Sequence, residues 1–145
     1  KANEFRQDYP SVTLKNLFPL VAEERMQKDD DEIKLIKDAI ELTKQGLNNV
    51  MANLKPGMKE YQAQADFEYV IRRGGAEWTA FPTIAGSGAN GTMLHYDTNR
   101  KTIEDGTLLL LDLGARIDGY NSDITAPGRS FLLKSTVTSC TSIPR

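Results

Sequence analysis

The chain has 145 residues, a length that suits one domain with a buried core, and 26% of them are charged. The formal net charge of −2 gives no electrostatic reason to expect binding to nucleic acid or to an acidic membrane surface, and no apolar run is long enough to span a membrane. A single cysteine, Cys140, cannot form an internal disulfide, which favours a reducing, cytoplasmic location.

Residues 1–28 predict little regular structure. Two prolines, Pro10 and Pro19, interrupt this stretch, and its apolar residues form a short extended pattern followed by one helical turn. We interpret the stretch as an arm or linker without chemistry of its own. Because the chain begins with Lys1 and not with Met, we expect it to be a segment of something longer.

Two amphipathic helices are predicted next. Three aspartates, Asp29 to Asp31, provide an N-cap and first-turn negative charge, and apolar residues then recur at helical spacing from about Asp31 to Asn53. The sequence Lys-Pro-Gly at 55–57 ends this helix. A second helix is predicted from Glu60 to Arg73, with two glycines after it. We expect the acidic and lysine side chains of both helices to face solvent.

From Ala76 onward the pattern changes to that of strands and loops. Residues 81–85 predict a strand, and residues 86–91 form a glycine-rich loop. This loop lacks the spacing and the Lys-Ser/Thr ending of phosphate-binding loops, so nucleotide binding is disfavoured. His95 follows the loop and is the only histidine of the chain. Taken alone, a histidine in this setting is more often structural than catalytic.

The most informative stretch runs from Thr107 to Thr125. Four consecutive leucines at 108–111 predict a strand buried on both faces, and Asp118-Gly119 predicts a two-residue hairpin turn. With that turn, Asp112 lies opposite Thr125, and Asp112 and Asp123 are diagonal neighbours on one face, with Cβ atoms about 7 Å apart. Two such acids repel each other unless they share a proton or a cation, and a pair of metal ions fits this spacing. A surface hairpin with solvated acids fits equally well.

These residues carry a family resemblance. The sequence LDLGARIDGYNSDIT at 111–125, with GSGANGTMLHY at 86–96, resembles the metal-binding core of the pita-bread metallopeptidases, and it is most similar to bacterial Xaa-Pro aminopeptidases and Xaa-Pro dipeptidases. The resemblance implies an α+β fold: half of a pita-bread domain, with two helices packed on an antiparallel sheet. It also implies that residues 1–28 are a linker from a missing N-terminal domain and that residues 29–125 are the first half of the catalytic domain.

The resemblance further implies a chemistry. Enzymes of this kind bind two divalent ions through two Asp, one His and two Glu, and Asp112 and Asp123 match the two Asp positions. Ligand hardness favours Mn²⁺, with Co²⁺ and Zn²⁺ as alternatives. His95 matches a catalytic histidine that touches the substrate and assists proton transfer, a role suited to imidazole. The substrate would be a peptide with proline at its second position.

The other three expected metal ligands have no counterpart in this chain. Residues 126–145 depart from the family pattern, and we expect them to be a divergent or frame-shifted tail. The isolated chain is therefore expected to bind metal weakly or not at all and to be inactive as an enzyme. The alternatives are a non-catalytic pita-bread module that binds peptides, or a truncation product without function. An uncovered sheet face or edge also predicts a homo-oligomer.

Overall fold

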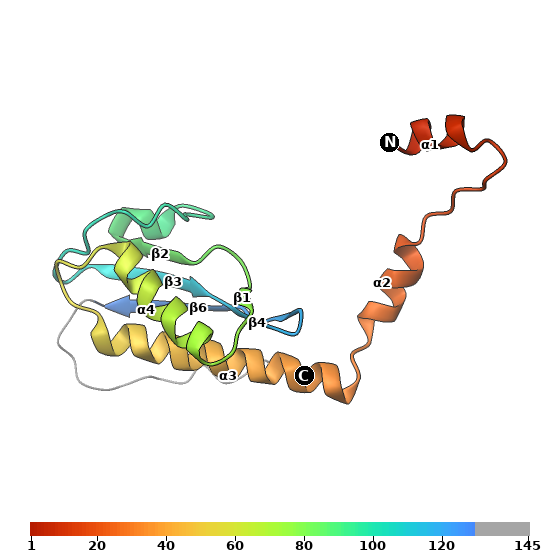
Figure 1. Ribbon diagram of the computed structural model, residues 1–145. Coiled ribbons are helices and arrows are strands. Elements are labelled where there is room, and N and C mark those ends of the chain that lie inside the picture. Colours follow the sequence, from red (N-terminus) through yellow and green to blue (C-terminus); the bar gives the residue numbers. More distant parts are fainter. Residues whose placement is uncertain (130–145) are drawn as a thin grey trace. The chain divides into compact units, whose positions relative to one another are not determined.

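The computed structural model describes residues 1–129, which divide into two units at about residue 33. The first unit contains α1 (Ala2–Asp8) and α2 (Phe18–Met26), neither of which buries a residue. The division falls in the first turn of α3 (Asp30–Asn53; Figure 1). There the backbone N–H of Glu32 donates to the Asp29 carboxylate at 2.9 Å, and the Asp29 N–H donates back to the Glu32 carboxylate at 2.8 Å. This reciprocal cap confirms the predicted helix start.

The second unit combines helices with two small antiparallel sheets, which confirms the predicted α+β class. One sheet has the order β2-β3-β6 and the other has the order β1-β4-β5. Helix α4 (Glu60–Arg73) has the predicted bounds. The strands and one 3₁₀ turn are β1 (Trp78–Thr79), β2 (Ile84–Ser87), η1 (Gly88–Thr92), β3 (Leu108–Leu113), β4 (Ala115–Ile117), β5 (Tyr120–Asn121) and β6 (Ile124–Arg129). Among residues 1–129, no helix combines the length and the apolar composition that a membrane span needs.

The core lies between the two helices and the larger sheet (Figure 1). Helices α3 and α4 approach closely at Gly46, where a Cβ atom would lie 2.5 Å from the Phe67 ring, so only glycine fits without repacking. The largest core side chains of these three elements are Leu42 and Val50 of α3, Phe67 and Ile71 of α4, and Leu109, Leu111 and Leu113 of β3.

Strand β3 is buried on one face, so the prediction of burial on both faces is wrong. Leu109, Leu111 and Leu113 are fully buried, whereas Leu108 is 54% exposed and Asp112 is only half-buried. Among the described residues the helices cover only one side of this sheet, and the strand alternates accordingly. As a result, Asp112 lies on the face opposite the core.

The hairpin has the predicted register. Asp118 and Gly119 both have positive φ, 46° and 83°, as a two-residue hairpin turn requires. Asp112 pairs with Thr125, as expected. Between the two sheets the chain passes through Gly114, where a Cβ atom would lie 2.2 Å from the carbonyl oxygen of Ser122. Glycine at this position lets the hairpin cross from one sheet to the other without a backbone clash.

Strand β6 continues four residues beyond Thr125, into the stretch expected to be a divergent or frame-shifted tail. Its last pair joins Arg129 to Leu108, so the backbone of residues 126–129 completes one edge of the larger sheet. Pro127 sits on this edge strand, where its missing N–H costs no interior ladder bond. The remainder of the predicted tail, residues 130–145, lies outside the described residues.

Candidate active site

One cavity gathers all three residues singled out in the sequence. It has a volume of about 350 Å³, and we call it the acidic cavity. Its lining comes from the segment that leads into β2, the segment after η1, strand β3 and the returning arm of the hairpin. The lining residues are Phe81, Pro82, Ile84, His95, Asp97, Asp112 and Asp123. The structure thus brings His95, which is distant in sequence, to the two hairpin aspartates.

Asp112 affects the ionisation of Asp123. Asp112 accepts a hydrogen bond from the Thr125 hydroxyl, with an Oγ1–Oδ1 distance of 3.0 Å. Partial burial raises the pKa of Asp123, and the negative charge and hydrogen bonding of Asp112 raise this pKa further. Two carboxylates that line one cavity form a site where a cation would be stabilised. Their hard oxygen atoms fit a divalent metal ion.

The donor set within the described residues is incomplete, however. Residues 1–129 contain no group of three or more His, Cys, Asp or Glu side chains placed to hold a metal ion. Residues 130–145 contain no His, Asp or Glu in their sequence, and Cys140 is the only residue of these four types there. The two aspartates fit a part of a metal site and not a whole one.

A buried hydroxyl pair holds the hairpin arm that carries Asp123. Thr43 of α3 and Ser122, the residue before Asp123, lie 2.7 Å apart through their hydroxyl oxygens. Both hydroxyls accept the backbone N–H of Ala115, at 2.8 Å and 3.0 Å respectively. Thr43 is fully buried. Its position on the apolar face of a predicted helix was the only sequence signal for this role.

His95 lies on an exposed segment with a strained backbone. Its φ is 54°, in the left-handed region that a side chain with a Cβ atom seldom adopts. Asn99, four residues later, also has a positive φ, 47°, and is fully buried. The Asn99 side chain donates to the Thr83 carbonyl at 2.7 Å and accepts the Ala85 N–H at 3.0 Å. These bonds fix one end of the segment to the start of β2.

The expectation that the acidic residues of the helices all face solvent is wrong for Glu60. This side chain, at the first position of α4, is completely buried. Burial raises its pKa, but hydrogen bonds from the Ser87 backbone, the Tyr96 and Ser87 hydroxyls and the Lys101 backbone together lower the pKa below its ordinary value. Helical periodicity could not reveal this, because the donors lie 27 to 41 residues away in sequence.

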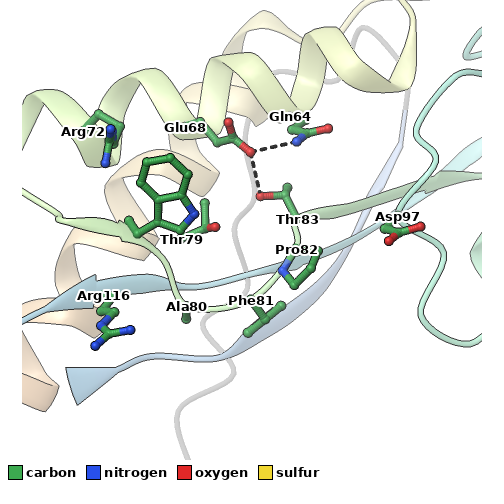
Figure 2. A pocket seen from close by; sticks show the side chains of 11 residues that line it. Gln64, Glu68, Arg72, Thr79, Ala80, Phe81, Pro82, Thr83, Asp97 and Arg116 are labelled. Carbon is green, nitrogen blue, oxygen red and sulfur yellow. Dashed lines mark hydrogen bonds between the residues drawn. The ribbon is translucent and has the colours of Figure 1, made fainter. Parts of the chain in front are cut away.

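A second cavity, of about 680 Å³, adjoins the first and shares Phe81, Pro82 and Asp97 with it (Figure 2). On its α4 side, Arg72 stacks over the Trp78 ring at 4.5 Å from the ring centre. Glu68 accepts hydrogen bonds from Gln64 at 2.8 Å and Thr83 at 3.1 Å, as drawn in Figure 2. Sequence reasoning did not identify this cavity.

Comparison with known proteins identifies the class. Residues 34–133 match Metallopeptidase family M24. The chain is 38% identical over 107 residues to the Xaa-Pro aminopeptidase of Escherichia coli K12, covering 74% of this chain and 24% of that protein. It is 36% identical over 111 residues to the Xaa-Pro dipeptidase of Pyrococcus horikoshii, covering 77% of this chain and 32% of that protein.

Solved structures give the same result. The proline aminopeptidase P II of Yersinia pestis superposes with a TM-score of 0.78 at 36% identity, covering 80% of this chain and 27% of that one. The chain therefore belongs to Metallopeptidase family M24. Within that family it matches Xaa-Pro aminopeptidases and dipeptidases, which confirms the resemblance and the pita-bread fold expected from the sequence. It spans about a quarter to a third of the length of these relatives.

Proposed function

We propose that this chain supplies part of the active site of a metal-dependent peptidase that hydrolyses the bond between an N-terminal residue and proline. The observation that carries the proposal is the acidic cavity, where His95, Asp112 and Asp123 lie together. The names of the relatives, Xaa-Pro aminopeptidase and Xaa-Pro dipeptidase, support proline at the second position of the substrate.

Each of the three residues has a proposed role. Asp112 and Asp123 hold divalent metal ions, two in the whole enzyme, with Mn²⁺ favoured by the oxygen-rich donors and Co²⁺ or Zn²⁺ as alternatives. Bound ions supply Lewis-acid activation of water and of the scissile carbonyl. His95 holds the peptide and moves a proton between its imidazole and the reacting groups, a role to which an imidazole side chain is suited.

The 145-residue chain alone is proposed to be inactive. Asp112 and Asp123 offer at most four carboxylate oxygens, whereas octahedral Mn²⁺ sites use about six donors for each ion. Any metal held by these two residues should be weakly bound, exchangeable and mononuclear. The remaining His and two Glu ligands implied by the family must come from residues outside this sequence.

The metal site can be tested through the single histidine. Because Mn²⁺ is paramagnetic, an ion bound in the acidic cavity should broaden the NMR signal of the His95 ring. We expect Asp112→Asn to abolish this broadening at low Mn²⁺ concentration. Asp97→Asn, which changes another carboxylate of the same cavity, is the matched control and should leave most of it. Equal loss in both variants would contradict the assignment of Asp112.

The activity can be tested in a chimaera. In this experiment, residues of the chain replace the matching segment of the E. coli Xaa-Pro aminopeptidase. We expect metal-dependent release of the N-terminal residue from a peptide with proline second, and little release when alanine replaces that proline. Activity that is indifferent to added metal or to proline would refute the proposal. Peptide binding without hydrolysis, unaffected by metal, would instead favour the non-catalytic module.

Self-association is also proposed, with a second copy of the chain as the partner. Leu108, on the sheet face opposite the core, is 54% exposed, and Leu94, in the loop between η1 and β3, is 93% exposed. Exposed apolar side chains of this kind favour association. Sedimentation velocity should show dimers or larger species at micromolar concentration, and Leu108→Lys should shift the population to monomers. A stable monomer of the unmodified chain would refute this.

A further inference from the structure

The buried carboxylate of Glu60 accepts hydrogen bonds from several residues of the segment that carries His95. The Glu60 Oε1 atom accepts the Ser87 N–H at 2.7 Å, the Ser87 hydroxyl at 2.7 Å and the Asn90 side-chain amide at 3.1 Å. Its Oε2 atom accepts the Tyr96 hydroxyl at 2.7 Å and the Lys101 N–H at 2.9 Å. Five donors therefore converge on one side chain, and they span the segment from residue 87 to residue 101.

These bonds require an ionised acceptor. A deprotonated carboxylate presents two acceptor oxygens and no donor, so both oxygens can face these donors, whereas a protonated acid or an amide would turn one of its atoms into a donor. The lowered pKa of Glu60 agrees with this state. Within residues 1–129, no cationic side chain forms a salt bridge with Glu60. The buried negative charge of its carboxylate is therefore stabilised by N–H and O–H donors.

Besides the Glu60 bonds, the segment is held by a hydrogen bond from the Asn90 amide to the Tyr96 hydroxyl at 2.8 Å and by the Asn99 bonds four residues after His95. Met93 and Leu94, the two residues before the histidine, are 50% and 93% exposed. A positive φ at a residue other than glycine persists only where the surroundings impose it, and His95 has such a φ. The next residue, Tyr96, is the one bound to Glu60. The tether therefore acts one residue away from the strained position.

We propose that Glu60 is a positioning residue, whose buried carboxylate fixes the 87–101 segment and thereby places the His95 imidazole at the acidic cavity. This inference rests on the function proposed above for His95. Glu60 itself does not line the acidic cavity.

The test uses the NMR signal of the His95 ring in the 145-residue chain, a signal that is unique because the chain has one histidine. In Glu60→Gln, we expect this signal to move toward its position in the urea-unfolded chain while the helical circular dichroism remains. Tyr96→Phe removes the hydroxyl that donates to Glu60 and accepts from Asn90, leaves the other four Glu60 bonds in place, and should move the signal in the same direction by less. Val50→Ala, which truncates a core side chain of α3, is the control for general destabilisation and should leave the signal in place.

Each outcome decides the proposal. An unchanged His95 signal in folded Glu60→Gln overturns it, as does an equal shift in Val50→Ala. If Glu60→Gln does not fold, Tyr96→Phe decides in the same way. In the chimaera, Glu60→Gln should lower kcat about ten-fold with a smaller change in KM, because misplacement of a catalytic group acts mainly on the chemical step. An inactive parent chimaera would refute the peptidase function, while the NMR result would still test the positioning.

Discussion

The hydroxyl pair of Thr43 and Ser122 makes a sharp prediction about stability. Thr43→Val keeps the shape of the side chain and removes one acceptor of the Ala115 N–H, but the Ser122 hydroxyl remains 3.0 Å from that nitrogen. Ser122→Ala likewise leaves the Thr43 hydroxyl at 2.8 Å. Each single variant should therefore lower the free energy of unfolding by only about 1 kcal/mol, the ordinary value of a hydrogen bond.

The double variant should cost more than the sum of the two. With both hydroxyls gone, the fully buried Ala115 N–H loses both side-chain acceptors, and an unsatisfied buried donor costs about 1–3 kcal/mol. We expect a loss of about 3–5 kcal/mol in total, with a coupling of about 1–3 kcal/mol between the two sites.

Urea denaturation of the four proteins at neutral pH measures this cycle. Thr92→Val serves as a control, since it removes an exposed hydroxyl that donates to the Ala89 carbonyl at 2.8 Å, and it should change stability by no more than about 0.5 kcal/mol. Additive losses, or a double variant that costs less than the sum, would show that Ala115 does not depend on these hydroxyls.

Three further predictions concern charge and catalysis. The pKa of Glu60 in the folded chain is lowered from 4.5, so the ionised carboxylate stabilises the fold. This stabilisation is fully present above pH 4.5 and is lost as the pH falls through the folded pKa. The urea midpoints of the unmodified chain and of Glu60→Gln should therefore converge in acid. The pKa of Asp123 in the folded chain is raised from 3.8, so its ionisation destabilises the fold as the pH rises. Asp123→Asn should therefore raise the melting temperature at pH 7, by an amount equivalent to less than about 1 kcal/mol because solvent screens this exposed group. An unchanged or lower melting temperature would contradict the repulsion between Asp112 and Asp123. The purified chain with saturating Mn²⁺ should release no N-terminal residue from an Xaa-Pro peptide, and hydrolysis that disappears in Asp112→Ala would show that the site is complete without further ligands.

The sequence predicted the elements that depend on local signals. The bounds of α3 and α4 followed from caps, periodicity and glycines, and the hairpin register followed from Asp118-Gly119 alone. Because register fixes which residues share a face, it also placed Asp112 and Asp123 together.

What the sequence could not predict depends on contacts between distant segments. Glu60 had the sequence context of a solvated helix residue, and only the folded chain brings Ser87, Tyr96 and Lys101 to it. The leucine run suggested burial on both faces, but burial depends on which elements cover the sheet, and that information lies outside the strand itself.

Because buried and exposed side chains alternate along the six residues of β3, some positions are under selection for stability and others for the chemistry of the cavity. Leu109, Leu111 and Leu113 point to the helices, while Asp112 points to the cavity on the other side. A substitution at one of the three leucines should destabilise the fold and lower the amount of protein in the cell, whereas a substitution at Asp112 should change that amount little. Neighbouring positions on this strand can therefore evolve almost independently, and a lineage could lose or alter its chemistry at Asp112 while it retained the same scaffold.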